Sequence, residues 1–310
     1  MLTAVTGLMP VIALIALGWL IHRLGIVDGA GRGGIERLVY FVLFPALIVL
    51  TLARAEFGAI PWQALGLTLF LAVIAMGALC LALRRPLQAW LSFDGRAFTS
   101  LFQGATRWNT FVAVALVGSL FGSEGLALIS VAIVAMVPVL NLMAVFVLSH
   151  YAGGTRPPLR ILFKEIARNP LIWSCVVGLL LSVLGLVPVG PVATTLEVLG
   201  AAALPVGLLA VGAGLDVSAL RRPNAVHAVA IALRLVVMPA IGIVIALSLG
   251  LEGAALGTAL VALSVPTASN AYIIAKQLGG DAKLMAEIIT LQTIGAAVTL
   301  PLWLTLMAVA

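Results

Sequence analysis

The most constraining feature of this sequence is a series of long apolar runs that hold almost no charged side chain. The run from Leu126 to Leu148, for example, contains none. In hydrocarbon every backbone N–H and C=O must be paired, which limits spanning structures to helices and closed barrels. A barrel would show short segments in which apolar and polar residues alternate, and these runs show no alternation. The sequence therefore predicts an all-α integral membrane protein.

The composition and the placement of the charges agree with a chain embedded in a lipid bilayer. Charged residues make up 9% of the chain, against about a quarter in a soluble domain. The net charge of +6 does not indicate a nucleic-acid partner, because the charges lie in short clusters between the apolar runs. Cys80 and Cys175 fall inside runs, so neither a disulfide nor a metal site is expected, and no cofactor is implied. Residues 1–21 carry no charged side chain and thus lack the basic start of a cleavable signal peptide, which predicts a retained first helix.

A transmembrane helix requires about 20 apolar residues, and the charges, glycines and prolines divide the chain into ten candidate spans. These spans cover approximately residues 3–22, 38–54, 61–83, 97–121, 125–149, 169–188, 192–215, 225–250, 253–276 and 285–308. The longest connection separates two units of five spans each. The predicted organisation is therefore a first unit at 1–149, a cytoplasmic linker at 150–168 and a second unit at 169–310.

The distribution of Lys and Arg predicts the orientation, because basic residues accumulate on the cytoplasmic side. Of the 17 Lys and Arg residues, 14 lie in odd-numbered connections and only Arg54 lies in an even-numbered one; Arg107 and Arg234 lie within spans. We expect both termini outside the cytoplasm and the 150–168 loop inside it.

The chain repeats itself weakly at an offset near 160 residues. The matched features, in order, are Pro45 with Pro205, Glu56 with Asp216, Thr106-Arg-Trp-Asn109 with Thr267-Ala-Ser-Asn270, and Pro138 with Pro301. Because each half contains an odd number of spans, the second half must be inverted relative to the first. Inverted repeats are a recurring signature of secondary transporters.

Two of the predicted spans, the fourth and the ninth, carry signs of a break near the middle of the membrane. Pro266 removes a backbone donor and disturbs the preceding turn of span nine. Span four has no proline, but the polar run from Gln103 to Asn109 lies at a similar depth. Two broken helices that cross there would direct half-helix N-termini at one point, where their positive ends can hold an anion.

We therefore expect a substrate site at the crossing of spans four and nine. The candidate substrate-binding residues are Asn109, Asn270, Arg107, Thr106, Pro266, Thr267, Ser269 and Tyr272. The alternative for the amides and hydroxyls is ordinary interhelical hydrogen bonding, worth about 0.6 kcal/mol each. Arg107 is so deep that its insertion costs about 2.5–3.5 kcal/mol. It is interpreted as a ligand of the substrate anion, with snorkelling or a carboxylate partner as the alternative.

A second set of residues is considered for coupling or gating. Its members are Glu56, Asp216, Arg234, Glu287 and Gln292. The carboxylates lie near span ends, where hydrated acidic groups are ordinary, and Arg234 is interpreted as structural or as a counter-ion. The histidines at 22, 150 and 227 lie at predicted cytoplasmic edges, where an interfacial role is the default.

Three stretches resemble the auxin efflux carrier family of transporters. They are Pro10-Val-Ile-Ala-Leu-Ile-Ala-Leu-Gly18 with Leu38-Val-Tyr-Phe-Val-Leu-Phe-Pro45, then Asn109 with Arg107 two residues before it, and Val265-Pro-Thr-Ala-Ser-Asn270-Ala-Tyr272. The resemblance implies a ten-helix, bile-acid-symporter-like carrier of the bacterial type, located in a bacterial inner (plasma) membrane. It also implies a scaffold of spans one, two, six and seven, a moving domain of the other six spans, and a homodimer formed through the scaffold. Members of the family move auxin, or organic acids such as malonate and malate.

The sequence is best interpreted as a secondary active transporter that moves a small organic anion, malonate- or malate-like or an auxin-like carboxylate, by an elevator-type motion. An intramembrane enzyme acting on a lipid would require a nucleophile, base or metal-ligand set, and no HExxH-type motif is present, so no enzymatic activity is expected. A non-transporting sensor or a channel is the remaining alternative. Substrate identity, transport direction and the driving ion stay open at this level.

Overall fold

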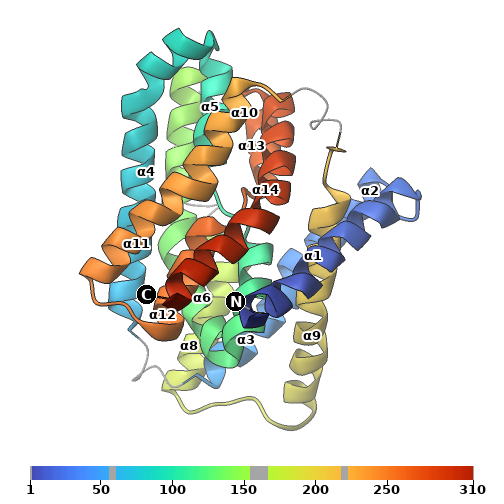
Figure 1. The fold of residues 1–310 in the computed structure, drawn as a ribbon. Helices are drawn as coiled ribbons and strands as arrows, with labels where there is room; N and C mark the ends of the chain where they lie inside the picture. Colours follow the sequence, from blue (N-terminus) through green and yellow to red (C-terminus); the bar gives the residue numbers. More distant parts are fainter. Residues whose placement is uncertain (1, 56–60, 154–166, 218–222, 310) are drawn as a thin grey trace.

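The computed structural model describes residues 2–55, 61–153, 167–217 and 223–309, and these residues form helices and short connections without a strand (Figure 1). Six helical stretches are long and apolar enough to cross a membrane, by length and composition: Gly29–Ala53, Trp62–Leu91, Gly95–Tyr151, Gly190–Ala213, Ala225–Ser248 and Ala282–Leu306. Shorter apolar helices cover Met9–Arg23, Pro170–Val183 and Gly253–Ser264. The chain is thus an all-α protein with several membrane-capable helices, as predicted. The inverted repeat of ten spans stays a prediction.

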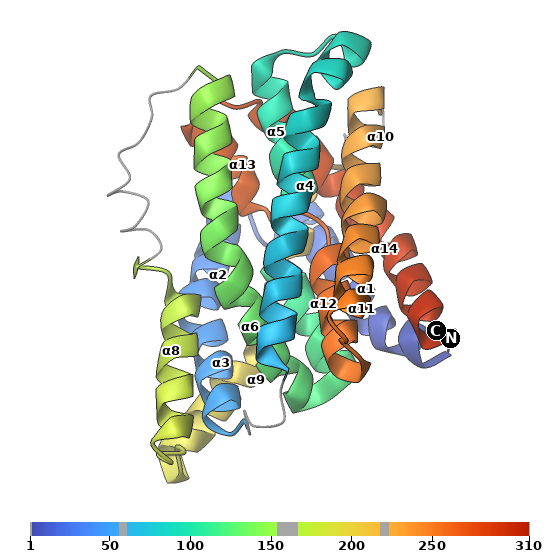
Figure 2. The ribbon, with the colours of Figure 1, turned by 90° about the vertical axis from the view of Figure 1, so that its left-hand side faces the viewer.

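The helices of the N-terminal half follow the predicted apolar runs. They are α1 (Leu2–Arg23), α2 (Gly29–Leu38), η1 (Val39–Leu43), α3 (Phe44–Ala53), α4 (Trp62–Leu91), α5 (Gly95–Thr106) and α6 (Thr110–Tyr151). Asp28 and Asp94 cap α2 and α5, because each side chain accepts a hydrogen bond from a backbone N–H of the first turn. Gly122, at φ 58°, kinks α6 between the fourth and fifth predicted spans. Figure 2 shows α6 beside α4 and α5.

The C-terminal half contains shorter helices separated by more breaks. They are α8 (Pro170–Val183), α9 (Gly190–Ala213), α10 (Ala225–Ala232), η4 (Leu233–Val237), α11 (Met238–Ser248), α12 (Gly253–Ser264), α13 (Asn270–Gln277) and α14 (Ala282–Val309). Asn169 and Asn224 cap α8 and α10. Polar residues therefore mark helix starts even where they interrupt apolar sequence.

Helix α4 continues beyond the predicted end of its span at residue 83. Its last turns contain Arg84, Arg85 and Pro86, which the charge pattern assigns to a loop. The Arg84 guanidinium lies 4.6 Å from the centre of the Tyr151 ring and donates to Gln88 Oε1 at 3.1 Å. These contacts support a helical extension because the long side chain can reach partners on α6 and on its own helix.

Two wide π-helical turns, η1 and η4, each precede a proline. In η4 the backbone N–H of Met238 donates to Leu233 O, five residues back. In a regular α-helix the Pro239 ring would clash with Leu235 O, and the wider turn moves the two groups apart. Because Pro239 has no N–H to offer, that carbonyl needs another donor. The indole Nε1 of Trp303, on α14, donates to Leu235 O at 2.8 Å.

The helices pack into two groups, and in Figure 1 α1, α2 and α9 of one group stand on the right while α4 and α11 of the other stand on the left. One group, here called the α9 group, contains α1, α2, η1, α3, α8 and α9. The other, here called the crossover group, contains α4, α5, α6 and α10 to α14. Helices α1 and α9 approach very closely, because a Cβ added at Gly18 would lie 2.2 Å from Leu209 O and one added at Gly212 would lie 1.9 Å from Ile15 O. Small residues of this kind allow tight packing of membrane helices.

Candidate functional site

The site is built where two interrupted helices touch. Between α5 and α6 the backbone is extended at Arg107 and Asn109, and between α12 and α13 it is extended at Val265. The backbone N–H of Asn109 donates to Pro266 O at 2.8 Å, which joins the two extended segments directly. Both predicted breaks are therefore present, including the one without a proline. We call residues 107–109 and 265–269 together the crossover.

Arg234 supports the crossover from the side on which α5 and α12 end. Its Nε donates to Val265 O at 2.7 Å, and its two terminal nitrogens donate to Ala262 O at 3.2 Å and Thr106 O at 3.4 Å. The side chain is fully buried. The last carbonyls of a helix lack partners and form the negative end of its dipole, so one cation satisfies the C-terminal ends of two half-helices.

Gln292, on α14, completes this support. Its Nε2 donates to Gly104 O at 2.9 Å and to Ala230 O at 3.0 Å, while its Oε1 accepts from the backbone N–H of Thr267 at 3.1 Å. The Thr267 hydroxyl also donates to Gly104 O, at 2.8 Å. These groups are buried, so their hydrogen bonds hold the two interrupted helices together.

On the opposite side of the crossover, the helix N-termini face a small cavity that contains Arg107. This cavity has a volume of about 80 Å³. It is lined by Tyr40, Arg107, Trp108, Thr110, Val137, Leu140, Asn141, Asn169, Leu171, Ala268 and Asn270. A guanidinium nitrogen of Arg107 donates to Asn141 Oδ1 at 3.1 Å and lies 3.4 Å from Asn270 Oδ1. The lining thus combines one cation with three amides, and among the described residues that line it there is no carboxylate.

A larger cavity of about 690 Å³ adjoins the small one. The two share Tyr40, Thr110, Leu171, Ala268 and Asn270 as lining residues. The larger cavity extends along α2, where Gly29, Ala30, Gly33, Gly34, Glu36 and Arg37 line it. It therefore connects the crossover with the α2 end of the molecule, which the positive-inside pattern predicts to be cytoplasmic.

Asparagines occupy the starts of three helices that border these cavities, α6, α8 and α13. Asn109 Oδ1 accepts from the N–H groups of Phe111 and Val112 at 3.1 and 3.3 Å, and Asn169 caps α8 in the same way. Asn270 is the first residue of α13 and is exposed to the cavity, whereas Asn109 is buried. The two asparagines matched in the sequence repeat thus differ: one caps its own helix, and the other contacts Arg107.

The structure places the eight predicted substrate-binding residues in different surroundings. Asn109, Asn270, Arg107 and Ser269 line one or both cavities. Thr106, Pro266 and Thr267 are buried within the crossover, where the Thr106 hydroxyl donates to Phe102 O at 2.8 Å. Tyr272 is half-buried and packs against the apolar core.

The residues that line the small cavity without being predicted from the sequence include Tyr40, Asn141 and Asn169. Asn141 is a lone amide between leucines in the middle of an apolar run, and a polar residue in that position is itself a sign of a functional site inside the membrane. Tyr40 lies in a stretch that resembles known carriers, yet no side-chain role was assigned to it. Asn169 precedes Pro170 and was interpreted only as the start of a span.

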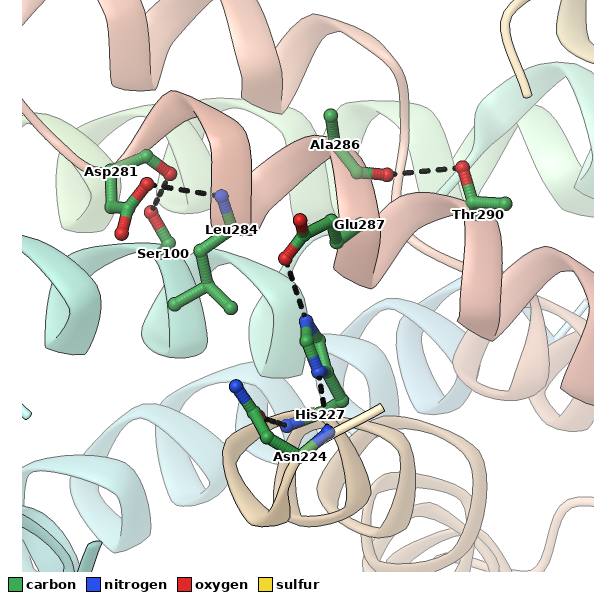
Figure 3. Close-up of polar contacts among 8 residues, drawn as sticks. All are labelled: Ser100, Asn224, His227, Asp281, Leu284, Ala286, Glu287 and Thr290. Carbon is green, nitrogen blue, oxygen red and sulfur yellow. Dashed lines mark hydrogen bonds and ion pairs between the residues drawn. The ribbon is translucent and has the colours of Figure 1, made fainter. Parts of the chain in front are cut away.

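Four of the five coupling candidates, Asp216, Arg234, Glu287 and Gln292, line neither cavity. Glu56 falls outside the described residues. Asp216 is exposed, and its backbone N–H donates to Thr290 Oγ1 at 3.0 Å, which connects the end of α9 with α14. Glu287 Oε2 lies 3.0 Å from Nε2 of His227, a buried histidine on α10 (Figure 3).

Comparison with known proteins gives matches along nearly the whole chain. The sequence pattern of the family described as "Membrane transport protein" matches residues 3–304. A protein of Methanothermobacter thermautotrophicus named "Uncharacterized transporter" is 27% identical over 308 residues, which cover 95% of each chain. A protein of Rhizobium meliloti named "Putative malonate transporter" is 29% identical over 301 residues, which cover 89% of this chain and 87% of the relative.

Proposed function

Since this chain belongs to the membrane transport protein family, the auxin efflux carrier family, we propose that it is a secondary active transporter of small organic anions. The family and the relatives are named as transporters, and no enzymatic activity is proposed. The single observation that carries the choice of substrate is the cavity at the crossover. There, Arg107, three asparagine amides and the N-termini of α6 and α13 converge.

A carboxylate suits this cavity for electrostatic reasons. A helix N-terminus carries about half a positive charge and stabilises a nearby anion by about 0.3–1 kcal/mol at an exposed site. Arg107 adds a full charge and donates at present to neutral amide oxygens. A carboxylate oxygen would make shorter and roughly twice as strong hydrogen bonds with the guanidinium. The displaced amides of Asn141 and Asn270 could then turn their NH₂ groups toward the anion.

The sizes of the cavities favour malonate- and malate-like acids. The small cavity of about 80 Å³ has room for one carboxylate beside Arg107, and the rest of the molecule would lie in the adjoining cavity of about 690 Å³. Arg37 lines that larger cavity beside Glu36, whose carboxylate is paired with Arg32 at 3.5 Å, so a second substrate carboxylate could face the Arg37 cation. The name of the Rhizobium relative supports malonate. An auxin-like carboxylate, with an aromatic ring in the larger cavity, is the second choice.

The proposed mechanism is an elevator-type motion of ten membrane-spanning segments arranged as two inverted repeats. The crossover is bonded mainly to its own group of helices, through Arg234 on η4, Gln292 on α14 and Asn141 on α6. The α9 group contributes one wall, including Tyr40 and Leu171. Because the substrate site is bonded to the crossover group and only covered by the α9 group, the crossover group could slide past the α9 group and carry the site with it. In this proposal the α9 group is the scaffold and forms a homodimer in a bacterial inner membrane, with both termini outside the cytoplasm.

Transport by the purified protein in proteoliposomes tests this function. Labelled malonate, malate and indole-3-acetate would be offered to wild type, Asn270→Ala and Arg107→Ala. The matched controls are Gln277→Ala, an exposed amide on the same helix α13, and Arg85→Ala, an exposed arginine on α4. We expect saturable uptake of one acid that the two controls retain and the two site variants lose by at least tenfold. If wild type takes up no acid under any ion gradient, the organic-anion assignment is wrong.

A further inference from the structure

A buried histidine and a carboxylate form a pair away from the cavities, and the hydrogen bonds assign the proton between them. His227 and Asn224 form a reciprocal cap at the start of α10, in which His227 Nδ1 accepts from the backbone N–H of Asn224 at 3.0 Å. An accepting Nδ1 carries no hydrogen, so in neutral imidazole Nε2 is protonated. Nε2 therefore donates to Glu287 Oε2, 3.0 Å away (Figure 3).

The pair can take one more proton. The His227 side chain is 3% exposed, but that of Glu287 is 24% exposed, so the carboxylate reaches the surface of the molecule, near an end of its predicted span. An added proton would reside on the carboxyl group of Glu287, or on His227 Nδ1 at the expense of the bond from Asn224. Histidine is the side chain type whose charge changes most readily near neutral pH, and here it shares a hydrogen bond with a carboxylate that could hold the same proton.

The other charged groups on the elements packed against α10 and α14 have contacts of their own or face outward. Asp281 accepts from the N–H of Leu284, Asp94 accepts from that of Ala97, and Arg96 donates to Gly279 O. Arg234 donates to the crossover carbonyls. Among the described residues, the remaining charged side chains on these elements are the exposed groups of Glu252, Lys276, Lys283 and Arg23, with Asp216 beside Thr290. Arg221 and Arg222, which precede α10 in the sequence, lie outside the described residues.

The two helices that carry the pair also hold the crossover. Along α14, Gln292 lies about 7.5 Å beyond Glu287, and along α10 and η4, Arg234 lies about 10 Å beyond His227, at about 1.5 Å per residue. Gln292 Nε2 also donates to Ala230 O of α10. Between Glu287 and Gln292, Thr290 Oγ1 accepts from the N–H of Asp216 at the end of α9. A change of charge at the pair therefore acts on the crossover support and on a contact between the two helix groups.

We propose that His227 and Glu287 form the proton-binding site of this transporter and that the proton travels with the anion. The proposal rests on the proposed function, because it assigns the driving ion of that transport. The pair and the crossover belong to the same group of helices, so the same motion would move both ligands in one direction. The proton would also offset part of the charge of the carboxylate.

Two assays in proteoliposomes separate proton coupling from transport itself. The first is exchange of labelled for unlabelled substrate at equal pH on both sides, which needs the anion site and the motion but no net proton movement. The second is net accumulation driven by a pH gradient, with an internal pH dye to record substrate-dependent proton entry. The variants are Glu287→Gln and His227→Gln. Glu252→Gln, an exposed carboxylate at the start of α12, is the matched control.

We expect wild type and Glu252→Gln to show both activities. Glu287→Gln and His227→Gln should keep exchange within about twofold of wild type but lose gradient-driven accumulation and proton entry by at least tenfold. Exchange in wild type without any response to a pH gradient would overturn the proton site and leave the transporter intact. Loss of exchange in both pair variants would also overturn it, because the pair would then serve the fold. Absence of exchange in wild type would instead refute the proposed function, and the proton site with it.

Discussion

At the scale of single residues, two buried arginines near the crossover have opposite roles. Arg107 contacts cavity-lining amides, whereas Arg234 contacts only backbone carbonyls among its described partners. In the proposed function the first binds the anion, whereas the second holds the two half-helix ends together. Substitutions at the two positions should therefore affect different measurements.

Arg107→Lys should weaken substrate binding although it keeps the charge. An ammonium group cannot reproduce the planar fork with which arginine binds a carboxylate. Loss of one charge-assisted hydrogen bond is worth about 1.5–3 kcal/mol, so we expect KM for uptake to rise by about tenfold or more while the melting temperature changes little. Kinetics of proteoliposome uptake measure this, with Arg85→Lys as the control. A KM equal to that of wild type would remove Arg107 from the substrate site.

Arg234→Met should destabilise the protein. It leaves the carbonyls of Val265, Ala262 and Thr106 without the guanidinium, and each buried unsatisfied group costs about 1–3 kcal/mol. We expect a melting temperature well below that of wild type when unfolding of the detergent-solubilised protein is followed. Arg107→Met serves as the comparison and should melt close to wild type. An unchanged melting temperature for Arg234→Met, with transport lost, would instead indicate a direct role in coupling.

At the scale of helical elements, the wide turn η4 and Trp303 compensate for one proline. Trp303→Phe removes the donor to Leu235 O and should destabilise the protein by about 1–3 kcal/mol. In Pro239→Ala a new backbone N–H can donate to the same carbonyl, so Trp303→Phe should cost less in that background. A double-mutant cycle on the free energy of unfolding measures the difference. Strict additivity would show that the indole does not compensate for the proline.

The sequence predicts the elements well where composition alone decides and less well where distant residues meet. Apolar runs locate the helices, because length and burial in lipid leave little choice. Pro266 and the polar run before Asn109 predict the two breaks from local chemistry. The partners of Arg234 and the contact of Asn141 with Arg107 join residues from separate helices. No local sequence pattern encodes such pairs. The position of the small cavity could therefore be predicted, but several of the residues that line it could not.

At the scale of the whole molecule, the elevator proposal requires the two helix groups to move relative to each other. Their contact at Asp216 and Thr290, where a backbone N–H lies 3.0 Å from a side-chain hydroxyl, offers a place to lock them. A disulfide needs Cα atoms about 4.4–6.8 Å apart, which such a contact favours. The native Cys80 and Cys175 are buried and should not interfere. The double variant Asp216→Cys/Thr290→Cys should therefore form a bridge between the groups on mild oxidation.

Oxidation of this variant should abolish exchange of substrate, and a reducing agent should restore it, because a bridge between two bodies stops their relative motion. The matched control joins residues of one group: Ser182 Oγ donates to Ala55 O at 3.1 Å within the α9 group. Ala55→Cys/Ser182→Cys should keep exchange after oxidation. Mass spectrometry of both proteins would verify that each bridge forms. If the oxidised Asp216→Cys/Thr290→Cys protein carried a fully formed bridge and still exchanged substrate at the wild-type rate, a sliding motion at this contact would be excluded. A local gating mechanism near the crossover would then be required.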